Sequence, residues 1–337
     1  MAGEAQSFLR MKLTLPRSEK IKKEIKKVKG LKFIVLLFTG ILISSSVKTV
    51  ANYLNVQENG FTTLVTHTRA KGMGGAFVAI ADDYGACYFN PAGLLQIKHK
   101  EIGAMYTDLY GMSLLTHSIL SYVEPDSGMG AGGISWSHLS ANLEPEKWDF
   151  DLFYYSYGQF FSPSEFTSKN VFSSWGINLK YLREIIEEEE AKGYGLDLTF
   201  LIRGKKISWG GNFQNVFSQV DWTTGKKESL PLNLKLGMAY TFSPCLILAL
   251  DFDLSRNNIP EEIHLGGEWW IGNNVALRLG GRKIFQESSK IIFSGGMGFY
   301  FPTKVEIEGV KAIKLDYAFS YDESLANTQQ FSLSFIL

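Results

Sequence analysis

From residue 101 to the end of the chain, apolar and polar residues alternate. In the segment CLILALDFDLS, Leu248, Leu250 and Phe252 fall on one face, and Asp251 and Asp253 fall on the other. The segments PLNLKLGMAYTF, NVALRLGGR and IKLDYAFSY follow the same pattern. A period of two residues predicts β-strands that have one apolar and one polar face.

Fourteen such segments can be counted, separated by short turn-forming runs such as GNN, SRNN and RGKK. They begin near Glu101, Met112, Gly128, Trp148, Val171, Gly193, Lys206, Pro231, Cys245, Glu262, Asn274, Lys290, Val310 and Gln329. The spacing is too short for parallel strands, which need a crossover of a dozen or more residues. We therefore expect antiparallel neighbours joined by hairpins.

Two architectures share this pattern, a soluble β-sandwich and a transmembrane β-barrel. The predicted strands have about 9–12 residues, which matches a tilted strand that crosses a membrane and exceeds the usual length in soluble sheets. Aromatic residues gather at segment ends, as in the pair Trp269 and Trp270, and this is typical of the interfacial girdles of barrels. The sequence therefore predicts an all-β fold, an antiparallel transmembrane barrel of about 14 strands. Because lipid cannot satisfy an open sheet edge, the last strand must pair with the first.

The N-terminal segment differs from the rest in charge. Residues 1–51 hold eleven Lys and Arg against three Glu, and the apolar run FIVLLFTGILI follows the basic part. That run is about half the length of a membrane helix, so residues 1–51 are predicted to be a signal peptide with cleavage after Ala51, and Ser46 is a second candidate for the cleavage site. An N-terminal membrane anchor is the alternative. The remainder has 23 basic and 31 acidic residues, which argues against nucleic acid as a partner.

The stretch RAKGMGGAFVAIADDYGACYFNPAGLLQ combines glycines, paired aspartates and an Asn-Pro turn. Gly72 and Gly74 fit the start of a dinucleotide loop, but Phe77 stands where the third glycine belongs, and no Gly-Lys-Ser/Thr follows. Asp82 and Asp83 have no further acidic residues at the spacing of metal ligands. We therefore predict neither a nucleotide site nor a metal site here.

The same stretch has the features of a compact plug. Asn90 can cap a helical turn, and Pro91 suits its first position. Fourteen strands enclose more space than wall side chains fill, so the lumen must hold water or a plug. We predict that residues 52–100 form an N-terminal hatch in the lumen of a barrel made by residues 101–337.

The motif GMGGAFVAIADDYGACYFNPAGL resembles the N-terminal signature of the FadL/PorV-like (PorV/PorQ) outer-membrane β-barrel family. Weaker similarities in later segments extend the resemblance over most of residues 60–337. It implies a fourteen-stranded barrel in the outer membrane of a diderm bacterium, with a hatch that blocks the lumen. The implied hatch residues are Gly72, Gly74, Gly75, Asp82, Asp83, Asn90, Pro91, Ala92 and Gly93. Their role is either gating or purely structural.

The resemblance implies three competing functions. The first is passive transport of a small hydrophobic solute, gated by the hatch. The alternatives are a PorV-like accessory protein of a secretion system and a structural outer-membrane protein. Partners would be membrane lipid, the outer-membrane assembly machinery, and either a solute or secretion components. Four cations on polar strand faces would line a solute path or, in the interpretation we favour, neutralise the lumenal Asp251, Asp253 and Asp316. The four cations are Lys235, Arg278, Arg282 and Lys314.

Nothing in the sequence supports catalysis or a cofactor, since the five histidines are scattered and no nucleophile elbow is present. Cys87 and Cys245 are expected to be isolated buried thiols, with a disulfide as the alternative. The acidic segment at 183–193 is expected to be a solvated extracellular hairpin rather than a calcium site. The longest loops are expected at 138–148 and 217–231.

Overall fold

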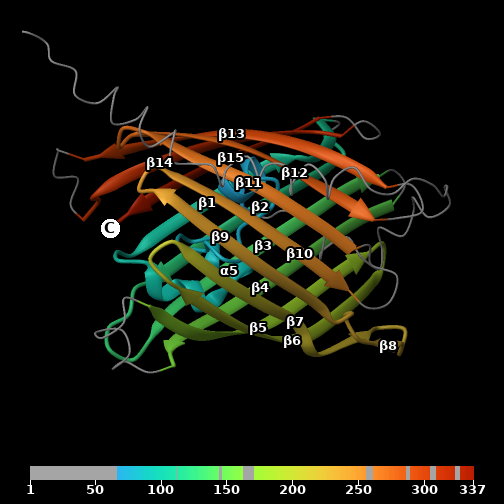
Figure 1. Cartoon of the computed structure of the whole chain (residues 1–337). Helices are drawn as coiled ribbons and strands as arrows, with labels where there is room; N and C mark the ends of the chain where they lie inside the picture. Colours follow the sequence, from blue (N-terminus) through green and yellow to red (C-terminus); the bar gives the residue numbers. More distant parts are fainter. Residues whose placement is uncertain are drawn as a thin grey trace, which may run out of the picture. The chain divides into compact units, whose positions relative to one another are not determined.

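The computed structural model describes residues 67–337, except 112, 144–145, 162–170, 256–260, 286–288, 304–308 and 323–326. The predicted signal peptide and the first part of the hatch, residues 52–66, lie outside the described residues. Within the described part, fourteen long strands form a closed antiparallel β-barrel (Figure 1). No helix in that part is long and apolar enough to cross a membrane.

The helical elements precede the barrel or lie in its first connection. They are α4 (Thr68–Gly72), α5 (Ala86–Phe89), η1 (Pro91–Gln96) and η2 (Leu109–Gly111). The strands are β1 (Glu101–Asp108), β2 (Leu115–Glu124), β3 (Ala131–Leu143), β4 (Glu146–Phe160), β5 (Phe172–Ile186), β6 (Glu189–Arg203), β7 (Ile207–Trp222), β8 (Lys227–Glu228), β9 (Asn233–Ser243), β10 (Leu246–Ser255), β11 (Glu261–Ile271), β12 (Val275–Phe285), β13 (Lys290–Pro302), β14 (Ala312–Tyr321) and β15 (Thr328–Ile336).

Each long strand pairs with its neighbours along the chain, and β8 is a two-residue addition that pairs with β7. The barrel closes where β1 pairs with β15, from Glu101 opposite Ile336 to Asp108 opposite Gln329. The predicted closure of the last strand onto the first is therefore confirmed. The fourteen-strand antiparallel fold is confirmed with it.

Several strands are longer than the predicted 9–12 residues. β4, β5 and β6 each have 15 residues and β7 has 16. The acidic segment at 183–193 is a hairpin with an exposed turn, as expected, but its expected length was wrong, because β5 continues to Ile186 and β6 begins at Glu189. Cross-strand partners explain this: Arg183 pairs with Glu190 at 2.7 Å, which offsets the repulsion of the acidic side chains. The expected loop at 138–148 was wrong too, since those residues belong to β3 and β4 apart from 144–145.

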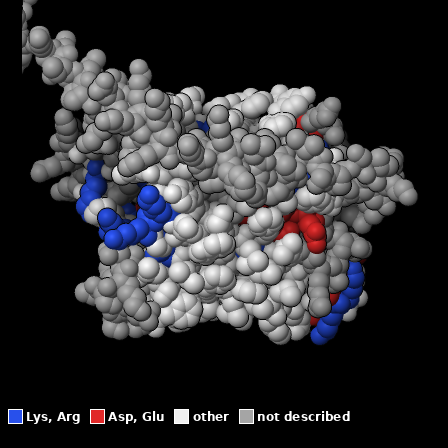
Figure 2. Space-filling view, viewed as in Figure 1, with Lys and Arg blue, Asp and Glu red and all other residues white. Residues whose placement is uncertain are grey.

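Apolar residues face outward and polar residues face the lumen. On β12, the Leu279 side chain is 75% exposed, whereas its neighbour Arg278 is buried. Figure 2 shows uncharged residues across the middle of the wall and charged residues toward its two ends. Four outward rings, those of Trp136, Phe153, Tyr181 and Tyr194, contact one another in sequence across β3 to β6, with centroids 5.5–6.3 Å apart. Such a belt is typical of a barrel that meets a membrane interface.

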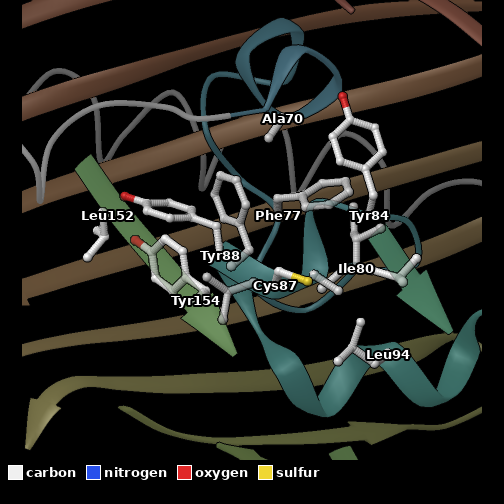
Figure 3. Packing of buried hydrophobic residues seen from close by; sticks show 14 of the residues in the cluster. Ala70, Phe77, Ile80, Tyr84, Cys87, Tyr88, Leu94, Leu152 and Tyr154 are labelled. Carbon is white, nitrogen blue, oxygen red and sulfur yellow. The ribbon is translucent and has the colours of Figure 1, made fainter. Parts of the chain in front are cut away.

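The hydrophobic core lies between residues 67–97 and the inner wall. Side chains of the hatch pack together in its centre, among them Phe77, Tyr84, Tyr88 and Leu94 (Figure 3). The helix α4 contacts β12 to β15, while η1 contacts β3 to β6. The described part of the hatch therefore spans the lumen from one side of the wall to the other.

Candidate functional site: the hatch and its contacts with the wall

Local sequence features shape the two ends of the hatch. At α4, the His67 side chain accepts a hydrogen bond from the Ala70 amide as the N-cap. After this helix the chain reverses through Gly74 and Gly75, whose φ angles of 68° and 94° favour glycine. The Asn-Pro turn opens η1, and Asn90 Oδ1 accepts a hydrogen bond from the amide two residues on.

Glycines of the wall let the hatch backbone approach the strands directly. A Cβ atom at Gly266 or Gly280 would lie closer than 3.0 Å to the backbone of Met73. A Cβ at Gly210 would meet the backbone of Val78 in the same way. Because backbone packs against backbone at these points, the lumen is tightly filled there.

Polar side chains of the wall satisfy the backbone of the hatch. Asp251 Oδ2 accepts hydrogen bonds from the amides of Phe77 and Val78, at 2.7 and 2.8 Å. On the other side of the lumen, wall side chains donate to hatch carbonyls: Asn178 Nδ2 to Cys87 at 2.9 Å, Asn212 Nδ2 to Phe89 at 3.0 Å, and Ser174 Oγ to Ala92 at 2.8 Å. Buried backbone groups need such partners, so these side chains fasten the hatch.

A network of charges joins α4 to the wall. Arg69 donates to Glu268 at 2.7 Å on β11, and to Asp82 and Asp83 at 2.6 and 2.9 Å within the hatch. Glu268 also accepts from Arg278 of β12 at 2.7 Å. Burial by itself would raise the pKa of the Asp83 carboxyl, but the neighbouring His67 and Arg69 hold this pKa well below its usual range. Asp83 is therefore ionised and paired.

The hatch residues implied by the family resemblance fall into three groups. Gly72, Gly74 and Gly75 lie against β11, β12 and β13, where Gly72 approaches Gly296. Asp82 and Asp83 meet at Arg69, and the Asp82 side chain remains 29% exposed. Asn90, Pro91, Ala92 and Gly93 are buried on the other side, where Asn90 Nδ2 donates to the carbonyls of Val78 and Phe200.

The four lumenal cations each have an acidic partner. Lys235 pairs with Asp253, Arg278 with Glu268 and Asp316, Arg282 with Glu262 at 3.2 Å, and Lys314 with Glu101 at 3.2 Å. Asp251 departs from the expected pairing, since it binds backbone amides of the hatch instead of a cation. The structure therefore favours neutralisation over a lining of unpaired cations.

Sequence reasoning missed the wall residues that hold the hatch. Glu268, Asn178 and Asn212 were not singled out, although each lies at an inward position of a strand. The alternation of faces could have placed them in the lumen, because a buried polar residue of this kind needs a partner there. Arg69 stands at the start of the quoted motif but carried no prediction of its own.

The two cysteines differ in their surroundings. Cys87 is buried in the hatch, and burial raises the pKa of its thiol to about 12. Cys245 is exposed, contrary to expectation, because it lies in the tight turn between β9 and β10. Both are free thiols. Within the described ranges, no group of three or more His, Cys, Asp or Glu could hold a metal ion.

The wall is interrupted between β7 and β9. Their pairing runs from Ile207 opposite Tyr240 to Gln214 opposite Asn233 and stops at Asn215, whose φ is 58°. Past this point, side chains of β7 donate to the carbonyls of Pro231 and Leu230. A pocket of about 340 Å³ lies at the interruption.

The barrel is similar in fold to solved transporters. The Pseudomonas putida toluene transporter TodX superposes with a TM-score of 0.56 at 10% identity, over 80% of this chain and 98% of that chain. For the Ralstonia pickettii toluene transporter TbuX the TM-score is 0.51 at 12% identity, over 80% and 96%. No protein-family model matches the sequence, and no curated protein matches it either. The likeness shows the fold, and it agrees with the FadL-like barrel that the resemblance implied.

Proposed function

We propose that the protein is a channel of the bacterial outer membrane for a small hydrophobic solute, and that its hatch closes the lumen. The observation that carries the proposal is the position of residues 67–97, which cross the lumen and are fastened to the wall by hydrogen bonds and ion pairs. These hydrogen bonds and ion pairs can break and re-form while the strands of the barrel stay paired. The fold, shared with two toluene transporters, supports the same class of solute.

The interruption of the wall beside β7 supports a hydrophobic rather than a polar solute. Val216 and Phe217 are exposed there, and Leu230 and Leu232 line the same pocket. A path through this pocket avoids the charges around Arg69. The charges that lie beside it, Lys180 and Asp197, are paired with each other and with Asn215, so an apolar molecule would not leave them without a partner. We also propose that the outer face of the barrel contacts membrane lipid. The outer-membrane assembly machinery would insert the barrel into the membrane.

One native thiol permits a direct test of gating. A Cβ atom added at Gly133 of β3 would lie 2.5 Å from the Cys87 sulfur, so a Gly133→Cys substitution needs only a small shift to reach disulfide geometry. The variant is made in a Cys245→Ser background, which removes the exposed thiol. The oxidised form ties the hatch to the wall, and the reduced form of the same protein is its control.

The assay measures uptake of radiolabelled toluene by cells of a diderm host that express the protein. We expect the wild type to raise uptake above that of cells without it. Oxidised Gly133→Cys should lose this increment, and reductant should restore it. If the disulfide forms, as mass spectrometry would report, and uptake is unchanged, the hatch does not gate the path. If the wild type does not raise uptake, the transport proposal fails.

A second candidate is an accessory role of the PorV/PorQ kind in protein secretion. The close packing of hatch backbone against Gly266 and Gly280 favours it, since a permanently sealed barrel suits a protein that works through its outer surface. This candidate predicts that the barrel co-purifies from its own membranes with components of a secretion machine. It also predicts that oxidised and reduced Gly133→Cys behave alike in that interaction.

A further inference from the structure

A small pocket lies between α4 and the inner wall, at the barrel end opposite the C-terminus. Its volume is about 40 Å³, and the hatch contributes Lys71 and Gly74 to its lining. The wall contributes residues of β12 to β15, of the connection after β1 and of the connection after β14, among them Arg282, Ser294 and Asp322. The pocket is therefore a place where hatch and wall face one another across an unfilled space.

Positive charge in this pocket is incompletely paired. Lys71 is half-buried, and its ammonium group has no hydrogen bond or ion pair with any residue in the described part of the chain. Arg282 also faces the pocket, and Glu262 is one of its partners. Asp322, the acidic residue of the lining, pairs with Lys290 at 2.5 Å. A sheltered ammonium group without a counter-charge is unfavourable, and an anion beside it would remove that cost.

Three hydroxyl groups line the wall at the level of these cations. Ser294, Ser320 and Thr328 lie opposite one another on the adjacent strands β13, β14 and β15. Ser294 is 6% exposed, and its buried Oγ has no hydrogen-bond partner among the described residues. Thr328 Oγ1 accepts a hydrogen bond from the Tyr110 amide, so its own hydrogen is left to donate. A hydroxyl row facing two cations offers donors to an oxygen anion.

We propose that this pocket binds one small oxyanion, a carboxylate or a phosphate, between the hatch and the wall. Lys71 and Arg282 supply the charge, and Ser294 with its neighbours donates hydrogen bonds. The volume admits a single group of this size. A bound oxyanion would connect α4 to β12 and β13. The proposal goes beyond transport of a neutral solute and holds whether or not the hatch opens.

The acid–base chemistry of Lys71 agrees with binding of an anion. Burial, together with the positive charge of the nearby Arg282, lowers the pKa of its ammonium group to about 7. An anion in the pocket would oppose both effects and restore the charge on the lysine. Uptake of a proton should therefore accompany anion binding near neutral pH.

The first experiment measures thermal stability of the folded full-length barrel in neutral detergent at constant ionic strength. Sodium acetate, sodium phosphate and sodium chloride are titrated in turn. We expect saturable stabilisation by acetate, phosphate or both, which also tells the two chemistries apart. Loss of one charge-assisted contact in Lys71→Met should weaken the apparent affinity about tenfold or more. Lys100→Met, which removes an exposed lysine paired with Glu124 outside the pocket, should leave the affinity unchanged.

Equal effects of the three salts, or equal affinity of Lys71→Met and wild type, would overturn the proposal. A second measurement uses the wild type, so that it tests the proposal even if Lys71→Met does not fold. Acetylation of lysines near neutral pH is followed residue by residue, with and without phosphate or acetate. Binding should slow modification of Lys71 and leave Lys100 unaffected. Unchanged modification of Lys71 at salt concentrations that stabilise the barrel would place the anion elsewhere.

Discussion

The two hydrogen bonds from hatch amides to Asp251 give a quantitative prediction about hatch opening. Asp251→Ala leaves the amides of Phe77 and Val78 buried without an acceptor. Each such loss costs about 1–3 kcal/mol, so the closed hatch should be destabilised by about 2–6 kcal/mol. Asp251→Asn is the matched variant, because its amide oxygen still accepts while the charge is lost. It should have a clearly smaller effect.

The assay uses Cys87 as a reporter in a Cys245→Ser background. This thiol is buried, so a maleimide reacts with it only when the hatch opens. If reclosing is faster than labelling, the labelling rate follows the population of the open state. A destabilisation of about 2 kcal/mol then raises the rate about 30-fold, since each 1.4 kcal/mol corresponds to a factor of ten. Asp251→Ala should reach at least that value.

Three results are informative. Fast labelling in Asp251→Ala and slow labelling in Asp251→Asn would support the clamp. Equal rates in both variants would assign the effect to the charge and refute the hydrogen-bond argument. The third result is a labelling rate in Asp251→Ala equal to that of the Cys245→Ser protein. If the gel mobility of the variant still changes on boiling, as expected of a folded barrel, this result would show that Asp251 does not hold the hatch closed.

Three further predictions concern fastening, charge and pH. Gly266→Ala should lower the temperature at which the folded band is lost on gels, because its Cβ meets hatch backbone. Gly267→Ala should not, since the one close neighbour of its Cβ is the flexible end of Leu248, and the nearest backbone atom is at an ordinary contact distance of 3.7 Å; equal effects would refute the close-packing argument. Arg69→Met removes one charged partner each from Glu268 and Asp83, which keep Arg278 and His67, and should cost about 1–3 kcal/mol in chemical unfolding; no measurable loss would contradict the network. Burial lowers the pKa of Lys71 from its ordinary value of 10.5 to about 7. The loss of folding stability from burying its positive charge is therefore complete below pH 7 and decreases as the pH rises toward 10.5. Wild-type thermal stability should therefore gain over this range relative to Lys71→Met, and parallel pH profiles would contradict this.

The barrel was predictable because each strand can be recognised from its own segment of the sequence. A strand with one face in lipid and one in the lumen must alternate between apolar and polar residues. Each such segment, for example the one from Leu246 to Ser255, therefore indicates a strand without reference to the rest of the chain. Closure then follows from the absence of water in the membrane. Strand lengths were less predictable, because a strand can continue through charged residues when the adjacent strand supplies opposite charges. The pairing of Arg183 with Glu190 is one such case.

The hatch contacts could not be predicted in the same way. Arg69 and Glu268 are 199 positions apart in the sequence, and no local pattern relates them. The break at Asn215 depends on one residue in a left-handed conformation, which the composition of the surrounding segment does not indicate. Even so, the polar inward positions of the strands limit which residues can meet the hatch, and the partners found are all drawn from those positions.

The two sides of the hatch are held by different chemistry, and this decides which side a ligand can influence. Near η1, asparagine and serine side chains donate to carbonyls, and these neutral contacts change little with pH or ions. Near α4, the attachment depends on charge: Arg69 is fully paired, whereas Lys71 on the same helix is not. A ligand that supplies negative charge beside Lys71 would therefore strengthen α4 against the wall and leave η1 unaffected. If the hatch opens in parts, anions in the medium should slow the release of α4 while labelling that reports the η1 side stays constant.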